Sequence, residues 1–597
     1  VEKFLSENPP RGLSSFLVAL SAALAVLAGH VETLLHVLVI VFVYLLWRAS
    51  SSGLSWGQCA RRLARFFLFS ALGLGMAAVQ FIPFLEYMYS SAAHATRAAY
   101  GVNPHYVPLP AAILNLIPDF YGNPIHGNYF APFANYCMTV IGFAGVTSVF
   151  LALLSLFSPS PRKKFIWFYL CLGAASFCIV YKVAPIYQLV VSLPFLDIAD
   201  NSRLLFCLGF SICVQASFFI HSLTENGPRS PRTAVVLAVA IFILAAAAVL
   251  AVCSKAFFEA HQFQFRFRHN LEPTLLFLAF LAATSFILLI CRRNPLTGRR
   301  AALYLGLLMF VQTGVHAIGF NPAIPEGRFF PTPPALRFLL SDRSLHRCLF
   351  MGNVFFPNLS AWYGIQEARN YDAMGIKSYR DFQSAMGNFQ NLFQVVTSFD
   401  EDLAGFLNVK YLMCERGYNP RLSMQVRYPE RYRRVFADSS VRIYENLAHM
   451  PRAFLVPKLR FIGSGDELLK ELPKLDYRNE ALVSDPNAPS LKSGDLSHSS
   501  CVVTRYRPRE AALKIHAEHP CYLVMSDNYF PGWRAFVDGR AQPIYRANGS
   551  FRLVPVRAAG DHNIRFCYSP FSFKIGAVIS LISLLAAVIM GARPVRH

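Results

Sequence analysis

Long apolar runs separated by short polar loops dominate the first half of the chain, and one more run lies near its end. A membrane span needs roughly 20 apolar residues. The run at 34–47 is the shortest of those that approach this length. The pattern predicts ten transmembrane helices, at residues 13–29, 34–47, 63–85, 136–157, 164–181, 203–222, 233–253, 273–291, 300–318 and 573–591.

The pattern changes at residue 320, where prolines such as those of Pro331-Thr332-Pro333-Pro334 interrupt the chain and apolar runs shorten to strand length. Short alternating runs with turn signals such as Asp538-Gly539 are typical of an antiparallel β-sandwich. We therefore expect a membrane domain at 1–319 with nine spans and outer loops 86–135 and 182–203, an α/β region at 320–463, a polar connector at 464–500, a β-sandwich at 501–570, and a last transmembrane helix with a basic tail at 571–597.

Composition supports a membrane protein, because 54% of the 597 residues are hydrophobic. The net charge of +22 does not indicate nucleic acid as a partner, since the basic residues gather in short loops between apolar runs, as the positive-inside rule describes. The loop at 254–272 is an exception. The bias predicts a multi-pass protein of the cytoplasmic (inner) membrane, with both termini cytoplasmic and residues 320–571 extracytoplasmic.

The loop at 86–135 is the longest of the predicted outer loops of the membrane domain. The helix before it delivers Gln80 and Glu86, and the loop itself carries Arg97, Asp119 and Asn123. A carboxylate and an amide at the end of a span suggest a site at the membrane surface. Equally, Gln80 and Glu86 can simply mark where the helix leaves the lipid.

Two other outer segments carry candidate groups. The turn after the first run holds His30 and Glu32, which form a charge pair, a metal site or a polar cap on a helical hairpin. The loop at 182–203 holds Asp197 and ends at Arg203. This arginine can clasp a phosphate with two hydrogen bonds, or it can anchor the span and pair with Asp200.

Several segments resemble the bacterial YfhO membrane protein family. The longest is Tyr522-Leu523-Val524-Met525-Ser526-Asp527-Asn528-Tyr529-Phe530-Pro531-Gly532-Trp533, which is similar to the C-terminal signature of that family. Gly29-His30 followed by Glu32-Thr33 resembles a Gly-His-x-Gln-Thr turn, with Glu where Gln is expected. Leu116–Gly122 and Leu407–Tyr411 also fit, so the resemblance extends over nearly the whole chain.

The resemblance implies a GT-C-like fold, in which a multi-span domain takes a sugar from a polyprenyl-phosphate carrier at the outer face and passes it to an envelope polymer. Such a transfer needs a carboxylate base, cationic side chains or a divalent cation to hold the leaving phosphate, and a groove for the lipid. The sequence shows no metal-ligand pattern. The candidate residues are Glu32, Glu86 and His30 for catalysis, and Gln80, Arg97, Asp119, Asn123, Asp197 and Arg203 for substrate binding.

Two alternatives remain, a non-catalytic protein that binds or presents lipid-linked glycan, and a transporter of lipid-linked sugar. GT-C enzymes usually carry their catalytic carboxylate in a large first outer loop, whereas the first outer turn here is short. Family members usually have further spans before the Gly-His turn, so the catalytic loop is expected to be missing from this chain.

Five cysteines lie in the region predicted to be extracytoplasmic, where disulfides form. Because five is odd, at least one should be unpaired within it. Cys521 and Cys567 lie in two predicted strands of the sandwich, and the sequence favours them as a pair.

Overall fold

The computed structural model describes residues 2–6, 12–100, 107–129, 136–158, 160, 162–193, 196–197, 199–226, 267–291, 298–318, 320, 323–369, 371–372, 374–390, 395–417, 430–463 and 465–592. The predicted span at 233–253 lies outside these residues. The chain forms two compact units. The first unit comprises Val1–His30, Val41–Ala99 and Phe330–His597, and the second comprises Val31–Ile40 and Tyr100–Phe329.

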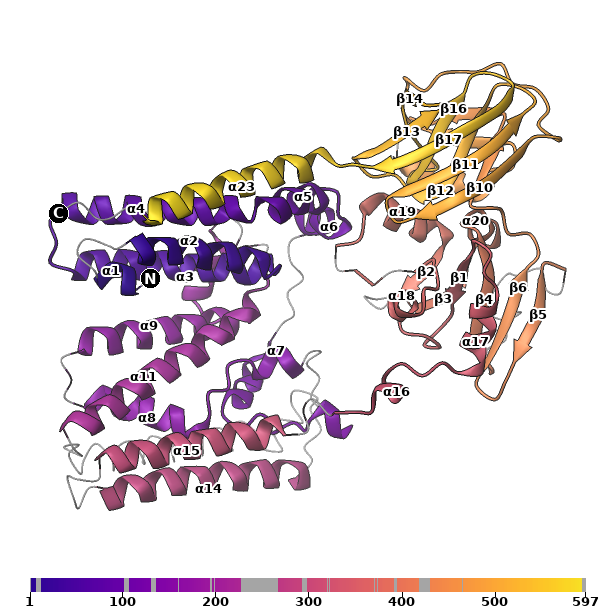
Figure 1. Cartoon of the computed structure of the whole chain (residues 1–597). Helices are drawn as coiled ribbons and strands as arrows, with labels where there is room; N and C mark the ends of the chain where they lie inside the picture. The colour runs from indigo at the N-terminus through magenta and orange to yellow at the C-terminus, as the bar shows by residue number, and fades with distance from the viewer. Residues whose placement is uncertain are drawn as a thin grey trace. The chain divides into compact units, whose positions relative to one another are not determined.

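The helices of the first unit are α1 (Glu2–Ser6), α2 (Gly12–Leu27), α4 (Trp56–Met76), α5 (Ala78–Tyr89), α6 (Ala92–Tyr100) and α23 (Phe571–Ala592). Glycines allow α2, α4 and α23 to pack closely (Figure 1). A Cβ added at Gly73 would lie 2.2 Å from the carbonyl oxygen of Ala19, and one at Gly75 would lie 2.2 Å from Oγ of Ser583. Any larger residue would therefore push these helices apart.

The second unit is built from η1 (Leu109–Asn115), η2 (Pro124–His126), α7 (Tyr136–Val140), α8 (Val146–Phe157), α9 (Lys163–Val180), α10 (Ile186–Val191), η3 (Asn201–Leu204), α11 (Leu205–Asn226), α14 (Phe267–Cys291), α15 (Gly298–Ala317) and α16 (Glu326–Phe329). Helix α3 (Val31–Ser51) begins in this unit and continues into the first. Buried Phe150, Leu154, Leu205 and Leu305 share one apolar core. Within that core, the Thr284 hydroxyl donates to the carbonyl oxygen of Phe280 at 2.7 Å and accepts from the Thr147 hydroxyl at 3.0 Å, so both buried hydroxyls have a partner.

Five helices among the described residues are long and apolar enough to cross a membrane, namely Val31–Ser51, Lys163–Val180, Asn201–Glu225, Glu272–Ile290 and Phe571–Ala592. The pair α4 and α5, bent by 74°, adds a sixth if it is counted as one broken span. The protein is thus a membrane protein, but the predicted ten spans are not confirmed.

Four predicted spans differ from the structure for local reasons. The run at 13–29 forms a helix of 16 residues, which is short for a span. The run at 63–85 bends between α4 and α5. The run at 136–157 splits into α7 and α8 around Gly145, whose φ of +86° suits glycine. Helix α15 ends at Ala317 and so covers nearly all of the run at 300–318, but its Gln312 and His316 lower its hydropathy.

The soluble part of the first unit opens with a four-stranded sheet in the order β1 (Arg347–Phe350), β4 (Val409–Glu415), β6 (Val441–Asn446) and β5 (Tyr432–Ala437). A two-stranded sheet joins β2 (Gly387–Gln390) and β3 (Val395–Phe399). Around them lie the helices α17 (Pro334–Ser341), α18 (Leu359–Tyr363), α19 (Lys377–Met386) and α20 (Glu401–Phe406). These helices and strands give this part of the chain a mixed α/β structure.

Two larger sheets follow (Figure 1). Their facing side chains, among them Leu513, Leu523, Val554 and Ile564, share one buried cluster. One sheet has the order β10 (Ser500–Arg507), β11 (Glu510–Ala517), β17 (Gly560–Tyr568), β13 (Trp533–Val537) and β14 (Arg540–Gln542). The other has the order β7 (Ala453–Val456), β12 (Cys521–Asn528), β16 (Phe551–Val556), β15 (Tyr545–Ala547), β9 (Glu480–Val483) and β8 (Lys458–Phe461).

This second sheet differs from the expectation in two ways. Strands β8 and β9 are parallel, so the sheet is mixed rather than antiparallel. Strands β7, β8 and β9 precede residue 500, and the predicted connector at 464–500 holds α22 (Gly465–Glu471), η5 (Leu472–Lys474) and β9. The polar composition of that segment reflects its exposed turns, while Ala481, Leu482 and Val483 are buried in the sheet.

The predicted pairing of Cys521 with Cys567 is wrong, because both are free thiols. Ala517, four residues before Cys521, pairs with Gly560 at the start of β17, whereas Cys567 pairs with Glu510 at its other end. The two sulfurs are thus separated by most of the length of β17. At about 3.3 Å per residue, that is far beyond the reach of a disulfide.

The first unit joins its soluble part to its helices at a junction formed by the ends of α5 and α6. The backbone N–H of Ala92 donates to the carbonyl oxygen of Gly375 at 2.8 Å, and that of Lys377 donates to Ser90 at 2.9 Å. The Tyr87 hydroxyl donates to Oδ2 of Asp372 at 2.7 Å. These contacts form a short two-stranded bridge, so the soluble part is attached to the helices by more than its covalent links.

Candidate functional site

In the second unit, the first turn of α3 contacts η3. Oε2 of Glu32 lies 3.4 Å from Nε of Arg203, and the two side chains are 18% and 26% exposed. The positive end of the α3 dipole favours a carboxylate at the position of Glu32. Arg203 does not pair with Asp200 as the sequence allowed, because Oδ1 of Asp200 accepts from the backbone N–H and the hydroxyl of Ser202. The predicted groups Glu32 and Arg203 are therefore brought together.

His36 lies one helical turn beyond Glu32 and is 1% exposed. Its Nε2 is 3.0 Å from Oδ1 of Asn201. Since the amide nitrogen of Asn201 donates to the carbonyl oxygen of Leu196 at 2.8 Å, Oδ1 is the accepting atom. The neutral ring of His36 must then carry its proton on Nε2, which leaves Nδ1 as a buried acceptor with no hydrogen-bond partner among the described residues.

Sequence reasoning selected His30 and missed His36. His30 is an exposed residue of the first unit. The signal for His36 was its spacing of four residues from Glu32, which places both side chains on one face of a helix.

A small cavity of about 50 Å³ lies beside η3. Lys182, Tyr187, Asp197 and Asp200 contribute to its lining, together with apolar residues from the end of α9. Nζ of Lys182 lies 5.7 Å from the centre of the Tyr187 ring, so the cation is held over an aromatic face. Asp200 is buried by its contacts with Ser202, whereas Asp197 is exposed at the rim.

Asp119 and Asn123, predicted to bind substrate, lie together in a second cluster of this unit. Oδ1 of Asp119 accepts from the Tyr136 hydroxyl at 2.6 Å and from the Asn123 amide at 3.1 Å, and Oδ2 lies 3.7 Å from Nδ1 of His316. Burial raises the pKa of Asp119, but the hydrogen bonds from His316, Tyr136 and Asn123 outweigh that effect and hold the pKa below its ordinary value. Asn123 also caps η2 through the N–H of Ile125, which is a structural role.

The remaining predicted residues belong to the first unit. Oε2 of Glu86 accepts from the Ser572 hydroxyl at the start of α23, at 2.7 Å. Gln80 is exposed and lies near the turn at Gly29. The side chain of Arg97 lies outside the described residues. No group of three or more His, Cys, Asp or Glu side chains suited to a metal ion occurs in the part of the chain that the structure describes.

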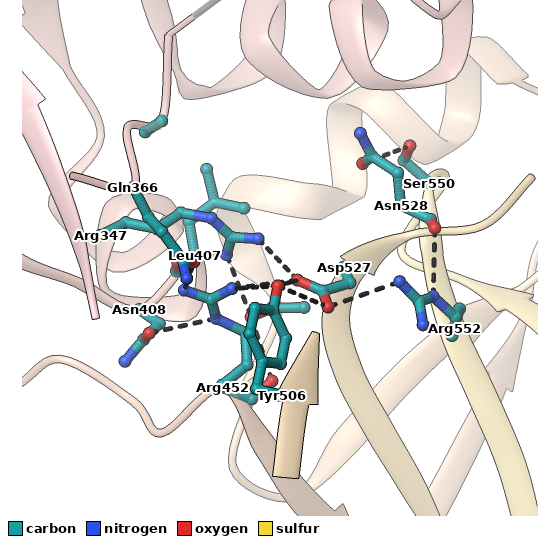
Figure 2. A network of polar contacts seen from close by, with 12 residues as sticks. Arg347, Gln366, Leu407, Asn408, Arg452, Tyr506, Asp527, Asn528, Ser550 and Arg552 are labelled. Carbon is teal, nitrogen blue, oxygen red and sulfur yellow. Dashed lines mark hydrogen bonds and ion pairs between the residues drawn. The ribbon is translucent and has the colours of Figure 1, made fainter. Parts of the chain in front are cut away.

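A third polar cluster lies in the soluble part and was not predicted (Figure 2). Oδ1 of Asp527 lies 2.8 Å from Nη2 of Arg347 and 3.1 Å from Nη1 of Arg452. Oδ2 accepts from the Tyr506 hydroxyl at 3.0 Å and lies 3.4 Å from Nη2 of Arg552. Burial raises the pKa of Asp527, but the charges of Arg347, Arg552 and Arg452 outweigh that effect and hold the pKa below its ordinary value.

The other donors of these arginines are largely satisfied by protein groups. Arg347 donates to the carbonyl oxygen of Leu407, and Arg452 donates to Asn408 and Gln366. The guanidinium carbon of Arg552 lies 3.7 Å from the centre of a ring of Trp533. The cluster joins the four-stranded sheet to both larger sheets, so we interpret it as structural. Its sequence signal was a single carboxylate at the end of the apolar strand β12.

These features define a polytopic helical membrane protein with a large soluble part rich in β-sheet. Residues 490–580, which hold Asp527 and the start of α23, match the family described as "Bacterial membrane protein YfhO". The chain is 32% identical over 121 residues to "Uncharacterized protein YfhO" of Bacillus subtilis (strain 168), which covers 20% of this chain and 14% of that protein. No solved structure matches the chain. The predicted kinship with YfhO is confirmed over this C-terminal region.

Proposed function

We propose that the protein acts in cell-envelope glycosylation, as a GT-C-like transferase that takes a sugar from a polyprenyl-phosphate carrier at the outer face of the cytoplasmic membrane. The observation that carries the proposal is the pair of Glu32 and Arg203 beside a cavity that also holds Lys182. These groups lie at the ends of the candidate spans α3, α9 and α11, where a lipid phosphate would arrive.

Arg203 and Lys182 supply the positive charge for the phosphate, and the guanidinium can bind two of its oxygens at once. A phosphate that binds Arg203 competes with the Glu32 carboxylate. Once displaced, Glu32 becomes available to take a proton from the acceptor, which is an envelope polymer in this proposal. Nδ1 of His36, one turn away on the same face of α3, adds a buried hydrogen-bond acceptor behind Glu32.

The cavity limits how much of the donor it can take. Pockets for whole small molecules usually measure about 300–1,000 Å³, so a cavity of about 50 Å³ suits a phosphate at most. The sugar would then lie at the rim near Asp197, and the polyprenyl chain would lie along the lipid-facing helices.

A non-catalytic role is the second candidate, and one observation favours it. Both predicted carboxylate bases that the structure describes are already engaged, Glu32 with Arg203 and Glu86 with Ser572. A protein that only binds or presents the lipid-linked glycan needs the cations and no base. A transporter of that lipid is less favoured by the sequence, because charged residues are rare away from the ends of the apolar runs.

The decisive experiment uses the full chain in vesicles with a radiolabelled polyprenyl-phosphate sugar. We expect Arg203→Ala to weaken donor binding by about 10- to 100-fold, the worth of about 1.5–3 kcal/mol for hydrogen bonds to a charged group. Glu225→Gln is the matched control, since Glu225 pairs with His221 on the surface of α11. Equal binding by both variants would remove Arg203 from the site.

Orientation is tested by labelling. Ser497→Cys in the soluble part and Ser52→Cys between α3 and α4, in the basic segment 48–62, are placed in a background without other accessible cysteines. The proposal expects a membrane-impermeant maleimide to label the first but not the second in intact cells. If only Ser52→Cys were labelled, the orientation of the protein in the membrane would be the reverse of the one proposed.

A further inference from the structure

Three aromatic side chains with high exposure come from one short stretch of the soluble part of the first unit, between residues 356 and 371. Phe356 is 52% exposed, Trp362 is 66% exposed and Tyr371 is 39% exposed. We call these three residues the aromatic patch. Scattered exposed apolar residues are common, but a group of large aromatic residues usually marks a surface that meets something less polar than water.

The patch is held in place rather than being a loose loop. The amide of Asn358 donates to the carbonyl oxygen of Tyr371 at 2.6 Å, and its Oδ1 accepts from the Tyr371 N–H at 3.1 Å. The rings of Phe356 and Tyr371 lie 6.3 Å apart. Trp362 belongs to α18, which follows Asn358 directly, and its ring stacks on Phe330 at 4.2 Å. Specific contacts therefore hold the segments that carry these three rings.

The junction of the first unit gives the position of the patch. The residue after Tyr371 is Asp372, which accepts the hydrogen bond from Tyr87 in the last turns of α5. The neighbouring residue Glu86 accepts from Ser572, the second residue of the candidate span α23. Tyr371 therefore lies within a few residues of the level at which α23 and the broken span α4 and α5 end, which is the boundary between membrane and water.

We propose that the aromatic patch lies in the headgroup region of the lipid bilayer and holds the soluble part against the membrane surface. Tryptophan and tyrosine are the residues enriched at that boundary, because their rings are apolar and their N–H or O–H groups remain hydrogen-bonded to headgroups and water. The inference does not depend on glycosyl transfer, since any function of the soluble part would use the same attachment.

Tryptophan fluorescence of the full chain in vesicles provides the test. The emission spectrum of Trp362→Phe is subtracted from that of the unmodified protein. The difference is the emission of Trp362 alone. We expect this difference emission to be blue-shifted, and to be quenched in vesicles of phosphatidylcholine brominated near the headgroup more than in vesicles brominated near the chain end. The control adds Phe461→Trp to Trp362→Phe, because Phe461 is 49% exposed on strand β8. The new tryptophan should escape quenching.

Two results would overturn the proposal. A difference emission typical of water and quenched by neither lipid would mean that the patch faces solvent. A blue-shifted emission that neither lipid quenches would mean that protein covers the patch instead. Near-ultraviolet circular dichroism of Trp362→Phe should match that of the unmodified protein apart from the lost indole, which excludes misfolding as the cause of a changed signal.

Discussion

Asp527 and Glu32 are both carboxylates held by arginine, yet their surroundings differ in charge and in access. The Asp527 side chain is 9% exposed and contacts three arginines, while the Glu32 side chain is 18% exposed and contacts Arg203. Nearly all donors around Asp527 bond to protein groups. Beside Glu32 lies a cavity whose lining includes the ammonium of Lys182 and the carboxylate of Asp197.

The comparison separates a structural cluster from a candidate site by two physical criteria. A buried polar network whose members are satisfied holds elements together and has no capacity left for a ligand. A partly exposed ion pair next to open space can exchange one partner for another at modest cost. A lowered carboxylate pKa alone does not distinguish a functional site from a structural cluster, since a structural network lowers the pKa as well.

The largest effect is expected at Asp527. Asp527→Asn leaves the buried Arg452 and Arg552 and the half-buried Arg347 without their counter-charge, and breaking a buried pair of this kind costs about 3–5 kcal/mol. Thermal unfolding and limited proteolysis of the soluble part should show the loss. Asp561→Asn is the control, because the side chain of Asp561 is 87% exposed in its pair with His516. A change at Asp527 no larger than at Asp561 would contradict the structural interpretation.

Glu32→Gln should behave in the opposite way. Folding should be unaffected, while sugar transfer should fall by about 10²–10⁴-fold, the usual contribution of a general base. Donor binding should persist, since the cations remain. If this chain transfers sugar and Glu32→Gln does so at the normal rate, Glu32 is not the base. If the chain shows no transfer but binds the donor, the non-catalytic function is favoured.

Acid should sharpen the same contrast. Because the pKa of Asp527 is lower in the folded state than in the unfolded chain, its contribution is fully present above the unfolded value, near pH 4, and is lost as pH falls through the folded value. One carboxyl changes stability by at most about 1.4 kcal/mol per pH unit. Denaturant titrations below pH 5 should show a steeper loss for the unmodified protein than for Asp527→Asn; parallel curves would exclude this linkage.

The smallest effect is expected at the rim. Asp197→Asn should weaken donor binding by no more than about tenfold, because one hydrogen bond contributes about 0.5–1.5 kcal/mol. Binding isotherms of the polyprenyl-phosphate sugar measure this directly. Tighter binding would instead show that the Asp197 carboxylate repels the phosphate and does not contact the sugar.

The sequence predicted those helices whose apolar runs are uninterrupted, such as α9, α14 and α23, because periodicity and length are local properties. It did not predict the bend after Met76, which depends on how α4 and α5 pack against α23. The split around Gly145 had a local signal in Gly142 and Gly145, since two glycines in a short stretch weaken a helix. Strand β9 was hidden because it has only four residues and lies in a polar segment.

Sequence reasoning named Glu32 and Arg203 as separate candidates, but it did not predict that they contact each other. Glu32 and Arg203 were chosen by charge at the ends of apolar runs, and their contact links residues far apart in the sequence. The sequence offered Asp200 as the salt-bridge partner of Arg203, because adjacency along the chain is visible in a sequence and tertiary packing is not. The cluster around Asp527 was missed since Arg347, Arg452 and Arg552 come from separate strands and loops, and an arginine in a strand ordinarily faces water.

The bridge between Ser91 and Ile376 limits the degrees of freedom of the first unit. A domain that was connected to its membrane helix only at Phe571 would be free to rotate about the axis of α23. A second attachment, set to one side of that axis at α5 and α6, removes the rotation and leaves little more than a rocking motion. If the soluble part lies against the bilayer as proposed, the same face would meet it each time, and a change in the angle between α4 and α5 would be transmitted to the sheets as a torque.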